Sequence, residues 1–221
     1  MQLMVLMAKQ PLPGRAKTRL TPPLTAEGAA KLYQAFLQDK VAQMRLVEDV
    51  KPAIAYAPAE GRRYFAELAP DFELFEQEGE ALTIRLINVF DQAFQQGYNR
   101  VMAIDGDSPT LPPDNLREGF RALHDPATDV VLGPSADGGY YAIGMKKLWP
   151  SLFDVTMSTP RVTSDTLMRA EASGLRVHCL PEWWDVDRPE DLEKLKMTLS
   201  AGGPGAGFAA PATQQLLNSG K

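Results

Sequence analysis

Apolar and polar positions along the 221-residue chain change period repeatedly, and this pattern predicts strands alternating with helices. Short apolar runs bounded by turn-forming residues are typical of strands. Seven segments fit this description: Leu3–Ala8, Ala53–Ala57, Phe72–Phe75, Val101–Ile104, Asp129–Leu132, Tyr140–Gly144 and Leu175–Leu180.

Between most of these runs, apolar residues recur at the three- and four-residue spacing of a helix with one buried face. The longest such stretch begins at Ala26, after a Thr25 N-cap, and continues to about Leu46. The other four cover about residues 81–96, 115–123, 162–172 and 190–199. This alternation predicts an α/β fold whose mainly parallel sheet has helices on both faces. The strand over 140–144 follows its predecessor too closely for a helical crossover, so it is expected to be antiparallel or at an edge.

Length and composition predict one domain over residues 1–200, followed by a flexible tail rich in Gly, Ala and Pro over residues 201–221. The net charge of -5 argues against nucleic acid as the main partner. The single cysteine, Cys179, excludes an internal disulfide framework and is typical of the cytoplasm. No apolar stretch approaches the length of a membrane span, so none is expected.

The most informative chemical signal is Asp105-Gly106-Asp107, directly after the buried strand expected at 101–104. Open α/β sheets bind ligands outside the carboxyl ends of their strands. Carboxylates there can share a hard cation, and Mg²⁺ is usually held by one or two carboxylates together with substrate phosphates. Asp107 is the expected metal ligand. Asp105 either shares the ion or points back into the sheet and orients the site.

A basic loop follows the first strand, from Lys9 to Leu20. Its prolines stiffen it, and Gly14 allows a tight approach to a ligand. The spacing is not that of a P-loop, because no glycine precedes Lys17. Such a loop can still neutralise the diphosphate or triphosphate of a nucleotide. The four cations within it are Lys9, Arg15, Lys17 and Arg19.

Two further acidic segments follow. Asp137, beside Gly138-Gly139, can bind an acceptor hydroxyl, act as a base or reach the metal, although a Gly-Gly pair also marks a hairpin connection. Asp187 is the expected second metal carboxylate. The alternative for that segment is a simple helix start at Pro189.

Four motifs in this order carry a resemblance to a known family. They are Lys9-x-Pro-x-Pro-Gly-x-x-Lys17-Thr18-Arg19-Leu20, Asp107-Ser-Pro-Thr-Leu111, Gly133-Pro-Ser-x-Asp137-Gly-Gly-Tyr-Tyr141 and Asp185-Val-Asp187-x-Pro-Glu-Asp-Leu192. The chain resembles the nucleotide-diphospho-sugar transferase superfamily, in particular a bacterial glycosyltransferase-like group related to 2-phospholactate guanylyltransferases. The resemblance covers about residues 3–199. It implies a three-layer α/β/α Rossmann-like GT-A domain with a mostly parallel mixed sheet.

The resemblance also implies roles for residues. Asp107 and Asp187 would hold Mg²⁺ or Mn²⁺, whereas Asp105 is a further candidate only from its place in the Asp-Gly-Asp pattern. The expected reaction is glycosyl transfer from a nucleotide-diphospho-sugar to a small acceptor, with Asp137 as the base and Lys17 neutralising charge on the phosphates. The residues expected to bind the nucleotide are Lys9, Gly14, Lys17, Thr18, Arg19 and Arg85.

Alternatives remain open at this point. Nucleotidyl transfer would use an NTP donor and release pyrophosphate. A non-catalytic nucleotide-binding protein is a second alternative, motivated by Thr83 and Asp105, where the family tends to have glycine. A Rossmann dehydrogenase is disfavoured, because no G-x-G-x-x-G turn follows the first strand.

Overall fold

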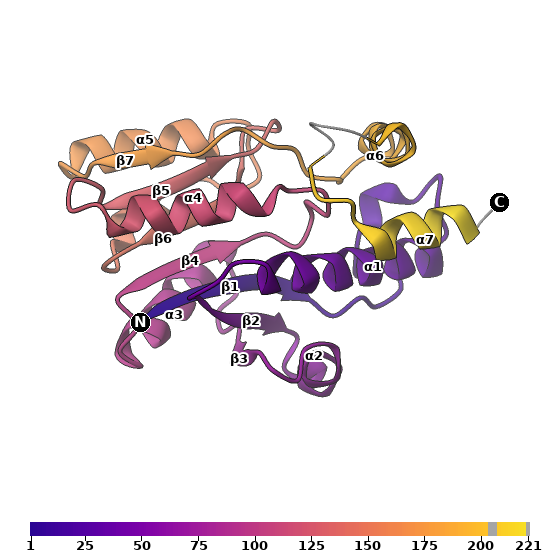
Figure 1. Cartoon of the computed structure of the whole chain (residues 1–221), viewed down its shortest axis with the longest axis horizontal. Helices are drawn as coiled ribbons and strands as arrows, with labels where there is room; N and C mark the ends of the chain where they lie inside the picture. Colours follow the sequence, from indigo (N-terminus) through magenta and orange to yellow (C-terminus); the bar gives the residue numbers. More distant parts are fainter. Residues whose placement is uncertain (203–206, 220–221) are drawn as a thin grey trace.

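The structure is a computed structural model that describes residues 1–202 and 207–219 (Figure 1). All seven expected strands are present, within a few residues of the expected ends. They are β1 (Gln2–Lys9), β2 (Lys51–Ala57), β3 (Glu73–Glu76), β4 (Arg100–Ile104), β5 (Val130–Pro134), β6 (Tyr140–Met145) and β7 (Val177–Cys179).

The five expected helices are also present, and the described residues form two more that the sequence pattern did not predict, α2 and α7. Thr25 caps α1 as expected, since its hydroxyl accepts a hydrogen bond of 3.0 Å from the Gly28 N–H. The helices are α1 (Ala26–Arg45), α2 (Arg62–Leu68), α3 (Leu82–Gln95), α4 (Pro113–His124), α5 (Val162–Ala172), α6 (Pro189–Ala201) and α7 (Pro211–Ser219). Three short 3₁₀ turns are η1 (Thr18–Leu20), η2 (Ala59–Gly61) and η3 (Pro150–Phe153).

The strands form one mixed sheet in the order β3-β2-β1-β4-β6-β5-β7. β6 runs antiparallel to both its neighbours, and the other strand pairs are parallel. The antiparallel prediction for residues 140–144 is confirmed, but the strand is interior rather than at an edge. β1 has β2 on one side and β4 on the other, so the strand order reverses there. Such a reversal opens a crevice at the carboxyl ends of the two central strands.

Helices cover both faces of the sheet, which gives the expected three layers. In β1, Met4 and Leu6 pack into the core shared with α1, α4 and α6, whereas Leu3 and Val5 pack into the core shared with α3 and α5. This alternation arises because successive side chains of a strand point to opposite faces. Figure 1 shows α1 and α4 in front of the sheet and α3 behind it.

The flexible tail expected from residue 201 does not hold for residues 207–219. The Asp39 carboxylate on α1 accepts hydrogen bonds of 2.9 Å from the N–H groups of Ala212 and Thr213, and so caps the first turn of α7. Ala210 and Thr213 are fully buried, and Phe208 N donates to the carbonyl of Thr110. The capping carboxylate lies in a distant helix, so tail composition alone did not reveal it. Residues 203–206 and 220–221 of the predicted tail lie outside the part of the chain that the structure describes.

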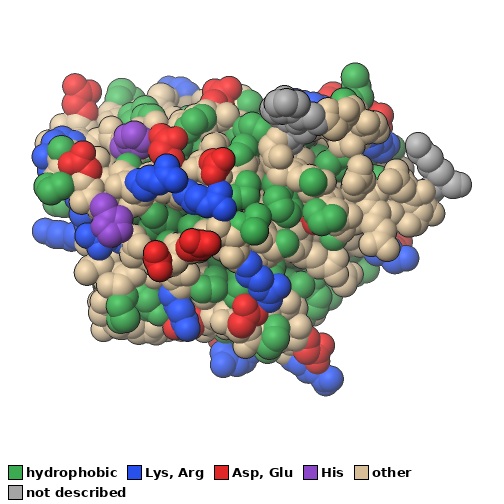
Figure 2. Space-filling view, viewed as in Figure 1, with side chains coloured by type: hydrophobic (Ala, Val, Ile, Leu, Met, Phe, Trp, Pro, Cys, Tyr) green, Lys and Arg blue, Asp and Glu red, His purple; other side chains and the backbone are tan. Residues whose placement is uncertain are grey.

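The view in Figure 2 shows charged side chains gathered over α4 and β7 and few over α7. This agrees with α7, whose nine residues carry no charge. Among the described residues, no helix combines the length and apolar character needed to cross a membrane.

Candidate functional site

A cleft of about 540 Å³ lies at the carboxyl ends of β1 and β4, where the strand order reverses. The loop after β1, the loop after β4 and the segment before α6 meet in it. All the predicted site residues except Gly14 and Asp137 contribute to its walls. Those present are Lys9, Lys17, Thr18, Arg19, Arg85, Asp105, Asp107 and Asp187.

Lys17 lies at the centre of the cleft wall, and its side chain is only 5% exposed. Its Nζ is 2.8 Å from Oδ1 of Asp107 and 3.8 Å from Oδ1 of Asp187, and it donates a 2.6 Å hydrogen bond to the carbonyl of Val186. Burial acts to lower the pKa of Lys17, but Asp107, Asp187 and Asp185 together raise it above its ordinary value. The ammonium therefore stays charged and joins three segments that are distant in the sequence.

The backbone around Lys17 is held in an uncommon conformation. Lys17 has φ 49° and ψ 41°, the left-handed region that residues other than glycine rarely adopt. On either side Ala16 and Leu20 are buried and anchor the loop. Such conformations persist where the surroundings hold them, often at functional sites. Next to it, the exposed Arg19 guanidinium pairs with Oδ2 of Asp187.

Asp107 is held by its backbone as well as by Lys17. Its carbonyl accepts a 2.9 Å hydrogen bond from Val186 N, which ties the loop after β4 to the segment before α6. The preceding residue, Gly106, packs tightly, because a Cβ there would lie 3.0 Å from the Tyr33 hydroxyl. This close approach presses the loop onto α1 and leaves the Asp107 carboxylate on the cleft side.

Asp105 faces the opposite way, toward α1. Its Oδ1 lies 3.3 Å from Nζ of the fully buried Lys40, and its Oδ2 accepts a 2.5 Å hydrogen bond from the Ser108 hydroxyl. Burial raises the pKa of Asp105 and lowers that of Lys40, and each partner opposes the shift of the other. The sequence left open whether Asp105 shares a metal ion or orients the site. Its contacts with Lys40 and Ser108 favour the second role, in which Asp105 supports the loop after β4.

Lys40 was missed by the sequence reasoning, although the sequence contains a signal for it. It lies four residues after Phe36 and four before Met44, which are both buried, so it shares the buried face of α1. A lysine on that face needs an acidic partner. Gln43, also buried on α1, donates to the carbonyl of Pro109 and holds the same loop.

Asp185 and Asp137 lie beside the cleft, near the β5–β6 connection. Burial and the neighbouring charges of Asp137 and Asp105 raise the pKa of Asp185 to about 6. Its Oδ1 accepts a 3.2 Å hydrogen bond from the Ser135 hydroxyl. Asp137 is exposed, and its Oδ1 accepts a 2.8 Å hydrogen bond from Gly139 N. Asp137 thus closes the hairpin turn that the Gly-Gly pair also indicated.

Two other expected residues, Arg85 and Gly14, have local structural roles. Arg85 lines the cleft from α3, and its Nε donates a 2.6 Å hydrogen bond to the carbonyl of Gly79. Gly14 is exposed at φ 72° with open space around its Cα, as a turn glycine requires.

Gln77 is a cleft residue that the sequence reasoning missed. Its amide nitrogen donates to the carbonyls of Ala8, at 3.0 Å, and Ala55, at 2.6 Å, so both amide hydrogens are engaged at the ends of β1 and β2. The signal was weak, since a polar residue after a strand is common.

Asp107 and Asp187 are the residues best placed to hold a metal. Their carboxylates both lie within 4 Å of the Lys17 ammonium, which acts as a stand-in cation between them. Hard carboxylate oxygens suit Mg²⁺ or Mn²⁺, and ions of this type commonly take their other ligands from phosphates and water. Within residues 1–202 and 207–219, no three His, Cys, Asp or Glu side chains gather into a metal-binding group. Two carboxylates by themselves are an incomplete ligand set for such an ion.

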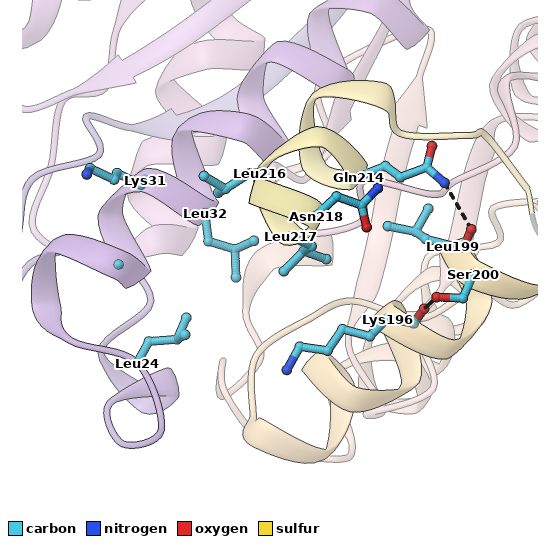
Figure 3. Close-up of a pocket in the computed structure, with 11 residues that line it drawn as sticks. Leu24, Lys31, Leu32, Lys196, Leu199, Ser200, Gln214, Leu216, Leu217 and Asn218 are labelled. Atoms are coloured by element: carbon cyan, nitrogen blue, oxygen red, sulfur yellow. Dashed lines mark hydrogen bonds between the residues drawn. The ribbon is translucent and has the colours of Figure 1, made fainter. Parts of the chain in front are cut away.

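A second cavity, of about 640 Å³, lies between α1, α6 and α7 (Figure 3). Leu24, Leu32 and Leu217 border the space between the helices, and Gln214 spans from α7 to the carbonyl of Leu199. Its walls are largely apolar, and its two lysines, Lys31 and Lys196, have no carboxylate beside them among the lining residues, unlike the cations of the first cleft. The chemistry therefore points to the cleft at the strand ends.

Comparisons with solved structures define the class of fold. A proposed nucleotide-diphospho-sugar transferase from Desulfovibrio desulfuricans G20 superposes with a TM-score of 0.89 and 30% identity, over 99% of this chain and 94% of that one. A CMP:2-keto-3-deoxy-manno-octonic acid synthetase complexed with CTP has a TM-score of 0.61 and 15% identity, over 91% and 99% of the two chains. A cytidylyltransferase from Leptospira borgpetersenii serovar Hardjo-bovis has a TM-score of 0.58 and 13% identity, over 100% and 95%.

The fold is therefore the α/β fold shared by nucleotide-diphospho-sugar transferases and nucleotidyltransferases, and the predicted resemblance is confirmed. The chain belongs to the bacterial family described as "Uncharacterized protein conserved in bacteria (DUF2064)", whose model matches residues 40–159. No curated protein matches the sequence significantly.

Proposed function

We propose that this protein is a metal-dependent transferase that uses a nucleotide-activated donor, with glycosyl transfer from a nucleotide-diphospho-sugar to a small acceptor as the leading reaction. The observation that carries the proposal is the convergence of Lys17 with Asp107 and Asp187 where the strand order reverses. Ligands bind at such places in open α/β sheets. The 30% identical relative of known fold, itself a proposed nucleotide-diphospho-sugar transferase, supports the donor class.

In this proposal the cations of the cleft bind the donor phosphates. Lys17 and Arg19 lie beside the carboxylate pair, and Lys9 and Arg85 lie on other walls of the same cleft. Charged hydrogen bonds to phosphate are stronger than neutral ones. Asp107 and Asp187 would hold Mg²⁺ or Mn²⁺, which when bound would neutralise phosphate charge as a Lewis acid.

For glycosyl transfer, the acceptor hydroxyl attacks the anomeric carbon while the bond to the nucleoside diphosphate breaks. Lys17 and Arg19 stabilise the negative charge that develops on the departing phosphate. The acceptor proton needs a base, and Asp137 is the proposed one. Its carboxylate already accepts a hydrogen bond from Gly139 N, so it would act with its other oxygen.

Nucleotidyl transfer is the second candidate, and the position of Asp137 favours it. Asp137 lies outside the walls of the cleft, on the exposed hairpin turn. An acceptor phosphate is already ionised and needs no base when it attacks the α-phosphorus and releases pyrophosphate. The synthetase bound to CTP and the cytidylyltransferase share the fold and motivate the same test.

The test is product analysis with a panel of nucleotide sugars and NTPs, with Mg²⁺ or Mn²⁺ and a mixture of small acceptors. Release of a nucleoside diphosphate that is lost in Asp107→Asn supports glycosyl transfer, whereas release of pyrophosphate identifies nucleotidyl transfer. The matched control is Asp114→Asn, an exposed aspartate on α4 paired with Arg117, which should behave like wild type. Binding of nucleotide without turnover would identify a non-catalytic protein, and absence of binding would refute the proposal.

A further inference from the structure

One cation of the protein lies close to both carboxylates that are proposed as metal ligands. Lys17 Nζ lies 2.8 Å from Asp107 and 3.8 Å from Asp187, so it fills the space between the two carboxylates proposed as metal ligands. It also donates a 2.6 Å hydrogen bond to the carbonyl of Val186. Because like charges repel, the Lys17 ammonium would oppose a divalent ion held by the same carboxylates. Lys17 and the metal therefore compete for one position.

The loop leaves the lysine side chain as the part that can move. Ala16 and Leu20 are buried on either side, and Lys17 itself holds a left-handed backbone conformation at φ 49°. A lysine carries its point charge on a flexible four-carbon stem, which can be redirected without moving its backbone. Lys17 and Arg19 both line the cleft, so a phosphate bound there would lie within reach of the redirected ammonium.

We propose that Lys17 is a resident cation that keeps the Asp107–Asp187 pair closed to metal until the donor phosphates draw its ammonium away. This inference rests on the proposed function, because it assumes that nucleotide phosphates and a divalent ion meet in this cleft. The metal then enters a site completed by phosphate oxygens, and metal alone binds weakly. By linkage, nucleotide raises metal affinity by the same factor by which metal raises nucleotide affinity.

The electrostatics favour such an exchange. Asp107, Asp185 and Asp187 all lie near the Lys17 ammonium and raise its pKa despite its burial. If Lys17 leaves with no replacement, these carboxylates are left close together without compensation. A divalent ion compensates them better than a single positive charge does. Arg19 also contacts Asp187 but is largely exposed, so its hold on that carboxylate is weak.

The experiment measures binding of Mn²⁺ alone to the full chain without nucleotide, from the electron paramagnetic resonance signal of free Mn²⁺. Wild type is compared with Lys17→Met, which keeps an unbranched side chain one atom shorter and removes the charge. The expected result is tighter binding in Lys17→Met by about tenfold or more, within the usual range of coupling between sites. Equal affinity in the two proteins would overturn the inference.

Two controls isolate the position of the charge. Arg19→Met removes a positive charge that pairs with the Asp187 carboxylate from an exposed position. It is expected to change the Mn²⁺ affinity less than Lys17→Met does. If Arg19→Met gains as much, general charge explains the effect and the inference fails. Lys17→Met with Asp107→Asn should lose the gain, and a gain that persists would place the ion elsewhere and refute the inference.

Folding and the underlying function are checked separately. If Lys17→Met does not fold, Lys17→Gly replaces it, because glycine adopts the left-handed backbone without strain. Nucleotide binding to wild type is followed in parallel by thermal shift with UDP, GDP and CTP. Failure of every nucleotide to stabilise wild type would refute the proposed function. Nucleotide binding without a gain of Mn²⁺ affinity in the Lys17 variant would refute this inference alone.

Discussion

Two lysine–aspartate pairs hold the same loop after β4 and have different surroundings. Lys40 is 0% exposed and Asp105 19%, whereas Lys17 is 5% and its partner Asp107 is 40% exposed. The first pair is enclosed between α1 and the loop, and the second opens to the cleft. The same residue types therefore support the fold in one pair and leave charge available for a ligand in the other.

The single residue between the two aspartates explains the difference. Gly106 lies against Tyr33 and Leu37 of α1, where an added Cβ would lie 3.0 Å and 3.4 Å from their side chains. The loop is pressed onto the helix at this point, so Asp105 faces the helix and Asp107 faces the cleft.

The largest expected effect comes from Lys40→Met. It leaves the Asp105 carboxylate beside a buried apolar side chain, and breaking a buried ion pair from one side costs about 3–5 kcal/mol. Denaturant unfolding measures the loss. Adding Asp105→Asn removes the unpaired charge and should restore most of the stability. A loss below about 1 kcal/mol in Lys40→Met, the range of an exposed pair, would show that the two pairs do not differ as described.

Asp107→Asn is expected to lower the free energy of unfolding less than Lys40→Met does. Its main effect is expected to be on nucleotide binding. It removes a charged partner of Lys17, worth about 1.5–3 kcal/mol for a hydrogen bond to a charged group. A nucleotide at 100 times its dissociation constant stabilises wild type by about 2.7 kcal/mol. Thermal shift with nucleotide and Mn²⁺ should show this gain in wild type and in the Asp114→Asn control. An equal gain in Asp107→Asn would remove that carboxylate from the proposed site.

A smaller, pH-dependent effect is expected at Asp185. Its pKa of about 6 in the folded protein exceeds the ordinary value of 3.8. The contribution of this carboxyl to stability is therefore fully present below about pH 4 and is lost as the pH rises through about 6.

Asp185→Asn cannot ionise, and its amide oxygen can still accept from Ser135. The variant should be more stable than wild type by roughly 1 kcal/mol at pH 8, where solvent around the partly exposed carboxyl reduces the effect. Near pH 4 the two proteins should be equally stable. Melting curves between these pH values measure the difference. A gain that does not vary with pH would assign the effect to packing.

The smallest effect is expected from Arg19→Met. The Arg19–Asp187 pair is exposed, and exposed pairs contribute about 0–1 kcal/mol to stability. Unfolding with and without added salt tests this, since screening removes what little the exposed pair contributes. A loss of unfolding free energy as large as that from Lys40→Met would show that the Arg19–Asp187 pair contributes like a buried ion pair.

Much of the fold was predictable because it depends on short-range pattern. Apolar runs such as Leu3–Ala8 and Val101–Ile104 are buried on both faces of the sheet, and their composition indicates this directly. Thr25 marks the start of α1 through a hydrogen bond to Gly28, only three residues away. The unpredicted helix α7, in contrast, is capped by Asp39, which lies more than 170 residues earlier in the chain.

The candidate site was predictable in part for a similar reason. Residues at the ends of neighbouring parallel strands meet at one edge of the sheet, so the basic loop and Asp107 could be placed together once β1 and β4 were recognised. Lys40 could have been suspected from its place among the apolar residues of α1. Its partner, however, lies 65 residues later in the chain, and periodicity does not pair residues across such a separation.

The sequence by itself determined the α/β class, the seven strands, the polar loops at their ends and the family resemblance, because these depend on local composition and on residue order. Tertiary structure alone decided which lysine pairs with which aspartate, and which of these pairs opens to the cleft. Whether an aspartate meets a buried lysine or a ligand cleft depends on which helix covers it, and whether a lysine is free depends on carboxylates brought from distant segments. Burial and proximity set these outcomes, since both the energy of a charge and its pKa depend on the surroundings that folding creates.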